Sequence, residues 1–181
     1  MTEERINKIK EYFSWTNDFA VGVYNISKEF NVGSLLRTAH CAKTKDFFLI
    51  GEKSYNTYSA VSSEKWTNVL YFKDLEEFLL CLENTTYNLV LVDQSPISKS
   101  LFEFNYPKSP LFLLGAEKGG LPSIIKNNKY PILEIPQYGL VQSLNLSCAG
   151  SIVIYHYLYT RYKTNTSNLG QGQIENEIRT H

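Results

Sequence analysis

Ser143 and Asn145 are the polar side chains whose spacing first suggests chemistry. They flank Leu144 in residues 135–147 (IPQYGLVQSLNLS), where an expected strand ends at Pro136 and a long apolar helix follows. Ser and Asn commonly cap a helix by accepting hydrogen bonds from its first free amides, but one cap needs only one such side chain. A loop from strand to helix is also where open α/β sheets bind ligands. The stretch therefore predicts a helix start or a binding cleft.

Arg37 is the second candidate, within residues 31–39 (NVGSLLRTA). Asn31 lies near the start of a helix predicted to run to about Lys43, Gly33 permits a close approach, and Arg37 falls on the second turn. Its neighbours are apolar or small, so we expect Arg37 at a largely buried helix edge. An arginine there usually needs an anionic partner such as a phosphate. The alternative is an ordinary exposed helical arginine.

Residues 113–122 (LLGAEKGGLP) form the third candidate. Gly115 ends an apolar strand, and the pair Gly119 and Gly120 lets the backbone turn sharply and approach a ligand. Glu117 is either a solvated loop carboxylate or part of a site. The chain contains no GxGxxG or GK[ST] phosphate loop, no convincing Ser-His-Asp order and no metal-ligand spacing. These observations predict a cleft lined by backbone, with one arginine and no metal.

The remaining sequence predicts an α/β fold with a mostly parallel sheet covered by helices. Nearly continuous apolar runs at residues 87–93 and 110–114 are typical of strands buried on both faces. Asp74 followed by Glu77 resembles a capping box at the start of a helix. Further strands are expected at residues 18–25, 46–51, 69–72 and 130–135, and helices at 2–13, 31–43, 74–82, 121–127 and 144–161. Residues 52–66 are expected to form a loop that could hold one helical turn.

The last of these helices has no clear polar face, because residues 151–159 read SIVIYHYLY. A helix that is apolar all round must be buried all round, and a small domain would normally expose one side of its last helix. We therefore expect a homodimer through this C-terminal helix. His156 is expected to be an interface or core residue rather than a catalyst.

Length and composition indicate one globular domain. The 181 residues are 43% hydrophobic and 20% charged, with 18 basic and 18 acidic side chains. Three dispersed cysteines favour a reducing compartment, and the absence of a signal peptide or membrane-length apolar run predicts a cytoplasmic protein without a membrane partner. We expect a helical extension at residues 1–17, the domain at 18–162 and a polar, disordered tail at 163–181.

Together the three stretches resemble the signature motifs of the SPOUT superfamily, in its SpoU/TrmH branch of RNA 2'-O-ribose methyltransferases. Residues 31–39 resemble motif 1, 113–122 motif 2 and 135–147 motif 3, in the family's order. The resemblance covers about residues 18–161. It implies a methyltransferase that uses S-adenosyl-L-methionine on a ribose 2'-hydroxyl of tRNA or rRNA. It also implies a homodimer and a C-terminal trefoil knot.

Site residues follow from the same resemblance. It implies a catalytic set of Arg37, Asn31, Glu117, Ser143 and Asn145. It places the cofactor among three loops near residues 93–95, 115–119 and 135–144, with contacts from Gln94, Gly115, Gly119, Ile135, Ser143 and Leu144.

Two questions stay open at this stage. A guanidinium is a poor general base at neutral pH, so Arg37 either binds phosphate and stabilises the forming alkoxide or takes a part in proton removal. The alternative to an enzyme is a non-catalytic RNA-binding relative of the same fold, although the intact motif residues speak against decay of the site. Base methylation on this fold is less favoured by the motif 1 pattern.

Overall fold

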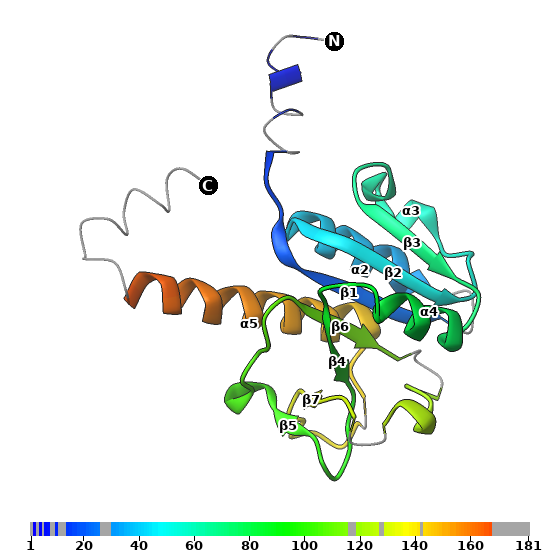
Figure 1. Cartoon of the computed structure of the whole chain (residues 1–181), viewed down its shortest axis with the longest axis vertical. Helices are drawn as coiled ribbons and strands as arrows, with labels where there is room; N and C mark the ends of the chain where they lie inside the picture. Colours follow the sequence, from blue (N-terminus) through cyan, green and yellow to red (C-terminus); the bar gives the residue numbers. More distant parts are fainter. Residues whose placement is uncertain are drawn as a thin grey trace.

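The computed structural model describes residues 2, 4, 6, 7, 10, 14–25, 30–115, 119–126, 129–141 and 143–167. Its centre is a seven-stranded sheet in the order β3-β2-β1-β6-β4-β7-β5 (Figure 1). Every strand pair described is parallel, which confirms the predicted α/β class. The strands are β1 (Asn17–Asn25), β2 (Thr44–Gly51), β3 (Asn68–Phe72), β4 (Asn88–Val92), β5 (Lys99–Ser100), β6 (Pro110–Leu114) and β7 (Ile132–Glu134).

Helices cover both faces of the sheet. They are α2 (Phe30–Cys41), α3 (Thr57–Ala60), α4 (Leu75–Leu82) and α5 (Leu146–Ser167), with single 3-10 turns η1 (Ser63–Lys65), η2 (Leu101–Glu103) and η3 (Ser123–Ile125). One buried cluster joins α2 and α5 to alternate residues of β1, β2 and β6. A second cluster joins α4 to the other face of the same strands. All five residues of β6 are buried, as its continuous apolar run predicts.

Helices α2 and α5 pack closely against each other. A side chain at Gly150 of α5 would place its Cβ only 2.4 Å from Leu35 Cδ1 of α2, so the small residue sets the spacing of the two helices. The hydroxyls of Thr38 and Ser151 lie 3.1 Å apart across the same contact. This pairing fixes the start of α5 relative to the sheet.

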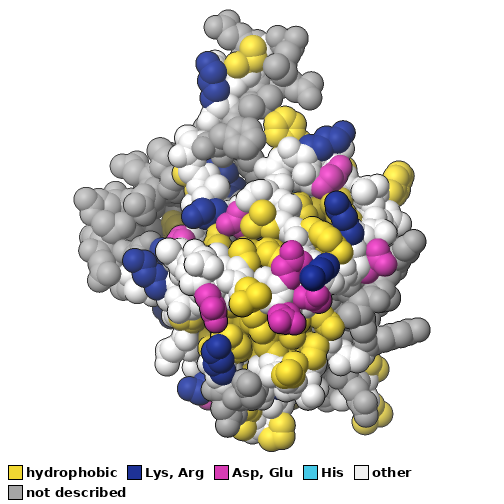
Figure 2. Space-filling model, turned by 45° about the vertical axis from the view of Figure 1, so that its right-hand side comes forward, with side chains coloured by type: hydrophobic (Ala, Val, Ile, Leu, Met, Phe, Trp, Pro, Cys, Tyr) yellow, Lys and Arg dark blue, Asp and Glu magenta, His cyan; other side chains and the backbone are white. Residues whose placement is uncertain are grey.

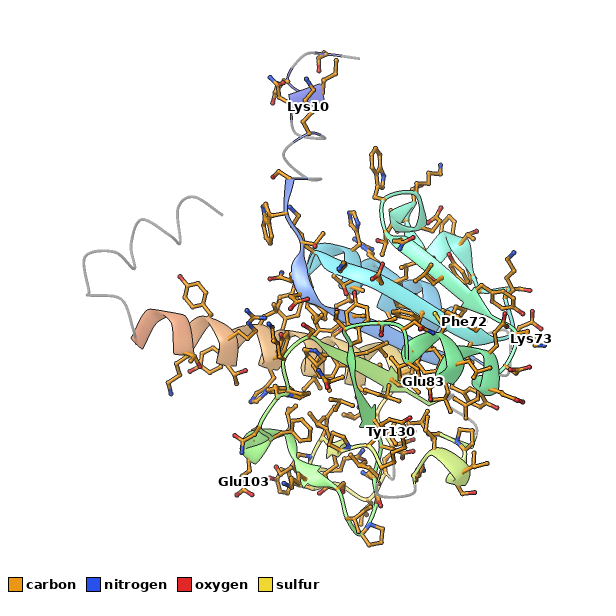
Figure 3. All side chains as sticks on the ribbon, in the orientation of Figure 1. Lys10, Phe72, Lys73, Glu83, Glu103 and Tyr130 are labelled. Carbon is orange, nitrogen blue, oxygen red and sulfur yellow. The ribbon has the colours of Figure 1, made fainter. Side chains whose placement is uncertain are left out.

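The predicted cap of α4 is confirmed. Asp74 Oδ1 accepts a hydrogen bond from the Glu77 N–H at 2.9 Å. Glu77 Oε2 in turn accepts from the Lys73 N–H at 2.8 Å, one residue before the cap position. Lys73 lies at the edge of the sheet where β3 leads into α4 (Figure 3). The box therefore ends β3 and begins α4 in one turn.

Helix α5 differs from the expected helix at both ends. It begins at Leu146 rather than Leu144, and it continues to Ser167, into the segment expected to be a tail. Residues 168–181 lie outside the described residues, as does most of the helix expected at 2–13. Figure 1 shows α5 extending well beyond the sheet toward the C-terminus. No helix in the described ranges is long and apolar enough to cross a membrane.

Within a single chain, α5 is buried on one side only, and the sequence predicts that its other apolar side needs a partner subunit. Val153, Ile154 and Tyr157 are buried against the sheet. The opposite side is exposed and carries Cys148, Ile152, Tyr155, Tyr159 and Tyr162. These residues follow a spacing of three or four, so they form one stripe along the helix, here called the α5 stripe.

His156, expected in the core or an interface, lies between these two sides of α5 and is partly buried. Its Nδ1 is 2.8 Å from the Tyr106 hydroxyl, and its ring meets that of Phe102 edge-on. Burial lowers the pKa of His156 below its usual value. The Tyr106 ring also packs edge-on against Tyr157, so the cluster ties the segment before β6 to α5.

Short elements account for most of the differences from the expected fold. Residues 52–66 contain α3 and η1, in the loop that could hold one helical turn, whereas η2 and β5 were not expected. Strand β5 is only two residues long and pairs with β7, which is too short to give a periodic pattern. Residues 121–127, expected to form a helix, contain only η3, and residues 127 and 128 lie outside the described part.

Candidate active site

A cavity of about 460 Å³ lies where strands β4, β6 and β7 end. The carboxyl ends of parallel strands meet at one edge of a sheet, and open α/β sheets bind ligands there. Backbone and side chains of three loops and the first turn of α5 line it. The lining residues are Val92, Asp93, Gln94, Leu114, Gly115, Gly120, Ile135, Gln137, Ser143, Leu144, Asn145, Leu146 and Ala149.

Most of the residues expected at the cofactor meet in this cavity. They come from three separate parts of the chain and include Gln94, Gly115, Ile135, Ser143 and Leu144. The next residue, Asn145, lines the cavity as well. Gly119 does not line it, whereas its neighbour Gly120 does. Glu117 lies outside the described residues.

Two glycines let the β6 loop fold back on itself. A side chain at Gly115 would place its Cβ 2.3 Å from the carbonyl carbon of Gly120 and 2.5 Å from the Leu121 nitrogen. Gly120 itself has φ +62°, in the left-handed region that favours glycine. A substitution at Gly115 would thus collide with the loop's own backbone. It would disturb the cavity wall and not simply fill the space of a ligand.

Asp93 lines the cavity from the loop of residues 93–95 that was expected near the cofactor, although no contact was assigned to it individually. It directly follows β4, and its carboxylate lies 2.5 Å from the Lys126 ammonium. Gln137 lines the cavity from the expected loop at residues 135–144, whereas Ala149 lies outside all three expected loops. A carboxylate at the end of a buried strand was the available signal for Asp93, since that is the edge where ligands bind.

Asn145 has the capping role that the sequence offered as its simpler interpretation. Its Oδ1 accepts hydrogen bonds from the Ser147 N–H at 2.9 Å, the Cys148 N–H at 3.3 Å and the Ser147 hydroxyl at 2.7 Å. It therefore caps α5 while it lines the cavity. Ser143 is exposed at the cavity and lies two residues before this cap. The two polar residues that looked equivalent in the sequence occupy different environments.

The expected burial of Arg37 is wrong. Helix α2 buries one side against the sheet and α5, with Val32, Leu35, Leu36 and Ala39 fully inaccessible. Residue 37 falls on the other side of a helix with 3.6 residues per turn, and its side chain is exposed. Arg37 is also not among the residues that line the cavity. The apolar neighbours in the sequence belong to the buried side and say nothing about residue 37.

The other motif 1 residues serve the packing of α2. A Cβ at Gly33 would lie 2.2 Å from Ser59 Oγ and 2.3 Å from the Asn56 carbonyl oxygen. Gly33 therefore allows α2 to contact the segment that contains α3. Asn31 is half-buried in the first turn of α2 and does not line the cavity.

A parallel sheet with a loop-built cavity at its carboxyl edge defines an α/β protein with a site for a nucleotide-sized ligand. The sequence pattern of the SpoU rRNA Methylase family matches residues 18–155. The chain belongs to this family.

Two relatives carry the same name. A mouse tRNA (guanosine(18)-2'-O)-methyltransferase, TARBP1, is 28% identical over 139 residues, which are 73% of this chain and 9% of the mouse protein. A tRNA (guanosine(18)-2'-O)-methyltransferase of Thermus thermophilus is 26% identical over 167 residues, 90% of this chain and 86% of that protein. The chain thus spans a small part of the mouse relative and most of the bacterial one.

Two solved structures share the fold. The TrmH/SpoU tRNA modifying enzyme of Aquifex aeolicus superposes with a TM-score of 0.76 at 24% identity, over 98% of this chain and 94% of that one. An AdoMet-bound rRNA methyltransferase of Sinorhizobium meliloti has a TM-score of 0.68 at 21% identity, over 82% of this chain and 58% of that one.

Proposed function

We propose that this chain is an S-adenosyl-L-methionine-dependent methyltransferase that methylates a ribose 2'-hydroxyl of RNA, with tRNA as the substrate class. The observation that carries the proposal is the cavity of about 460 Å³ at the carboxyl ends of β4, β6 and β7. It is lined by the loops in which family resemblance places the cofactor. The tRNA assignment rests on the relatives, which are named as tRNA (guanosine(18)-2'-O)-methyltransferases.

The residues of the cavity fit this cofactor. Its volume lies in the range of sites for small ligands, about 300–1,000 Å³, and its walls combine apolar side chains with backbone groups and a few polar ones. The cofactor supplies a methyl group carried by a positively charged sulfur. Gln94, Gly115, Ile135, Ser143 and Leu144 would hold and orient it.

The chain's own contribution to transfer is orientation and charge stabilisation. Aligning the ribose oxygen with a methyl group can remove several kcal/mol of barrier (about 7–11 in favourable cases). Arg37, with Asn31, is proposed to bind the RNA backbone and stabilise the negative charge that develops on the 2'-oxygen. Glu117, Ser143 and Asn145 complete the proposed catalytic set. Because Arg37 is exposed and outside the cavity lining, the bound RNA or a second subunit must bring the reacting ribose and Arg37 together.

The experiment that tests the function is nucleoside mass spectrometry of tRNA and rRNA from cells with and without the gene. We expect one 2'-O-methylated nucleoside to disappear from tRNA, and 2'-O-methylguanosine is the first to examine. The purified protein should restore it to the unmodified tRNA with labelled S-adenosylmethionine. An unchanged nucleoside profile, combined with no transfer in vitro, would refute the proposal.

The second candidate function is a non-catalytic RNA-binding relative of the same fold. It is favoured by the exposed position of Arg37, which leaves the proposed catalytic set incomplete at the cavity of one chain. Calorimetry separates the two candidates. The enzyme should bind S-adenosylhomocysteine, whereas the RNA-binding relative should bind RNA and neither form of the cofactor.

We further propose a homodimer that buries the α5 stripe. Ile152, Tyr155, Tyr159 and Tyr162 are 40%, 52%, 61% and 41% exposed, a large apolar surface for one helix. Aromatic side chains are enriched at subunit interfaces. The loop before α5 adds Tyr138, Leu140 and Val141, all strongly exposed. A second copy is the occupant that family resemblance implies.

Sedimentation at micromolar concentration tests the dimer. The mass should be near twice 20.8 kDa, and the double variant Ile152→Glu, Tyr159→Glu should be a folded monomer. Substitution of Ile154 is not a suitable test, because that side chain is 1% exposed and its replacement would unfold the subunit. A clean monomer for the unmodified chain would eliminate this proposal.

Two further family properties remain proposals. The C-terminal segment is proposed to form a trefoil knot, supported by the likeness of the fold to TrmH/SpoU structures. The cytoplasmic location stays a prediction from the sequence.

On the face shown in Figure 2, basic and acidic side chains are interspersed, so we look for the RNA phosphates on other faces of the molecule.

A further inference from the structure

The Asp93 carboxylate, in the cavity wall, connects three segments of the chain. Asp93 Oδ1 accepts a hydrogen bond from the Gln94 N–H at 2.8 Å, within the loop that follows β4. Asp93 Oδ2 accepts from the Leu121 N–H at 3.3 Å, in the loop that follows β6. The same oxygen lies 2.5 Å from the Lys126 ammonium, in the segment between η3 and β7.

The β6 loop is shaped to receive this carboxylate. A side chain at Gly120 would place its Cβ 3.3 Å from Asp93 Oδ2, so glycine leaves the carboxylate room at a position that also has a positive φ. The backbone of Gly120 and Leu121 is in turn packed against Gly115. A continuous series of contacts therefore runs from the end of β6 through Leu121 and Asp93 to Lys126.

These contacts use both oxygens of Asp93 for the protein itself. Its side chain is 20% exposed and that of Lys126 is 26% exposed, so the pair is partly shielded from water. A charge-assisted hydrogen bond in such a place is stronger than one on an open surface. Removing only the ammonium would leave a carboxylate uncompensated in the cavity wall. Asp93 is thus placed to hold the wall in position.

We propose that Asp93, compensated by Lys126, is a positioning residue that sets cofactor affinity by holding the turn at Gly120 and Leu121 against the β4 loop. The inference rests on the proposed function, because it concerns the site for S-adenosylmethionine. Asp93 acts on the cofactor through the loop, and it does not take part in the transfer itself. Its loss raises KM for the cofactor and leaves kcat at saturating cofactor nearly unchanged.

Calorimetry and kinetics of matched variants test the role. We expect the Kd for S-adenosylhomocysteine to rise about tenfold in Asp93→Ala and about threefold in Asp93→Asn and Lys126→Met, with kcat within about twofold. Lys126→Arg should restore affinity, and the double variant Asp93→Asn, Lys126→Met should be no weaker than the weaker single variant. Lys129→Met is the control, since Lys129 is exposed and its ammonium lies over the Tyr130 ring.

A comparison of two ligands separates positioning from direct attraction of charge. S-adenosylmethionine carries a positive sulfur and S-adenosylhomocysteine does not. If Asp93 holds the loop, both ligands weaken by the same factor in Asp93→Asn. If Asp93 instead attracts the sulfonium, only S-adenosylmethionine weakens, and that result would overturn the positioning role.

Amide hydrogen exchange provides a readout that needs no cofactor. The Leu121 N–H should exchange several-fold faster in Asp93→Asn than in the unmodified protein, while the Phe112 N–H in the buried strand β6 should not change. Unchanged exchange at Leu121, together with unchanged cofactor affinity, would refute the inference even if the protein proves to be an active methyltransferase. If Leu121 exchanged faster in Asp93→Asn but the protein bound no cofactor, Asp93 would still hold the loop and the proposed function would be refuted.

Discussion

Site residues of the three signature motifs lie in two regions: the cavity at the ends of β4, β6 and β7, and the exposed side of α2. One chain brings the cavity residues together, whereas Arg37 is not among the residues that line the cavity. The cavity gathers residues from three distant segments, held by backbone packing at Gly115 and by the Asp93 contacts. Arg37 stands on a helix whose other side is buried, and its own side chain is exposed.

This difference indicates a division of labour. If the proposed function holds, the fold of one chain preorganises the cofactor site, so affinity for S-adenosylmethionine should depend on the loops and not on Arg37. Under the same proposal, the exposed Arg37 acts only when the substrate or a second subunit is bound.

Replacing Arg37 should have the largest effect. Both Arg37→Ala and Arg37→Lys should lower methyl transfer about a hundredfold or more, the scale for losing one preorganised electrostatic group. Lysine keeps the charge but lacks the planar fork that binds a phosphate through two hydrogen bonds. Cofactor affinity should stay within a few fold. Single-turnover transfer from labelled cofactor, with calorimetry of the same variants, measures both quantities.

Lys108→Ala is the matched control for Arg37, since Lys108 is also exposed but precedes β6, at the amino edge of the sheet. It should leave transfer almost unchanged. Near-normal transfer by Arg37→Ala would remove motif 1 from the catalytic site. A large loss of cofactor affinity in that variant would instead show that the two regions are not separate.

Filling the cavity should weaken cofactor binding, whereas replacing Arg37 should mainly lower methyl transfer. Ala149 lies on the first turns of α5 and lines the cavity, so Ala149→Leu takes space from the ligand. We expect about tenfold weaker binding of S-adenosylhomocysteine, the scale of a few methylene groups in a fitted pocket. Ala149→Ser, which is nearly the same size, should bind normally. Equal affinity in the leucine variant would mean that the ligand lies elsewhere.

Variants of Ser143 and Asn145 distinguish a residue that caps α5 from one that only lines the cavity. Asn145→Ala removes an acceptor that serves three donors at the start of α5, so the free energy of unfolding should fall by about 1 kcal/mol. Ser143→Ala should change it by less than about 0.5 kcal/mol, because that side chain is exposed. Denaturant titration gives both values. Equal losses would show that both residues stabilise the helix.

The smallest expected effect concerns His156, on the part of α5 away from the cavity. Burial lowers its pKa in the folded state below the usual 6.5, so the unfolded chain binds the proton more readily. This contribution to stability is complete above pH 6.5 and is lost as the pH falls through the folded pKa. His156→Gln should therefore reduce the loss of stability between pH 7.5 and 5.5, as measured by denaturant unfolding. Cofactor affinity at pH 7.5 should not change.

The sequence predicted the buried parts of the fold well because their patterns are local. The apolar run of β6 coincides with the strand at residues 110–114, and Asp74 with Glu77 gave the start of α4 within one turn. Strand β5 could not be found, since two residues carry no periodicity and gain their strand geometry only by pairing with β7. The sequence indicated that α5 has more apolar surface than one chain can bury, but it does not show which side meets the sheet.

The candidate site also contains residues that were expected beforehand and residues that became evident only from the packing of distant loops. Gln94, Gly115, Ile135 and Leu144, which the family resemblance implied, line the cavity together, although they come from three distant loops. The resemblance named the loop at residues 93–95 without assigning a contact to Asp93, and it did not name Ala149, because such contacts depend on how the loops pack. Arg37 was misjudged for a related reason. Its neighbours along the chain are buried, but a helix turns each residue by about 100° from the last, so burial does not pass from one residue to the next.

The strand order has a consequence for how the chain assembles during synthesis. Both neighbours of β4 in the sheet, β6 and β7, come later in the sequence, and β6 is also the strand that joins β4 to β1. Until residues 110–114 leave the ribosome, the β3-β2-β1 unit and β4 cannot belong to one sheet, and each presents an unpaired apolar edge. At about 5–20 residues per second this interval lasts a few seconds. Chaperones or early aggregation would act on this protein in that window, before any cofactor site exists.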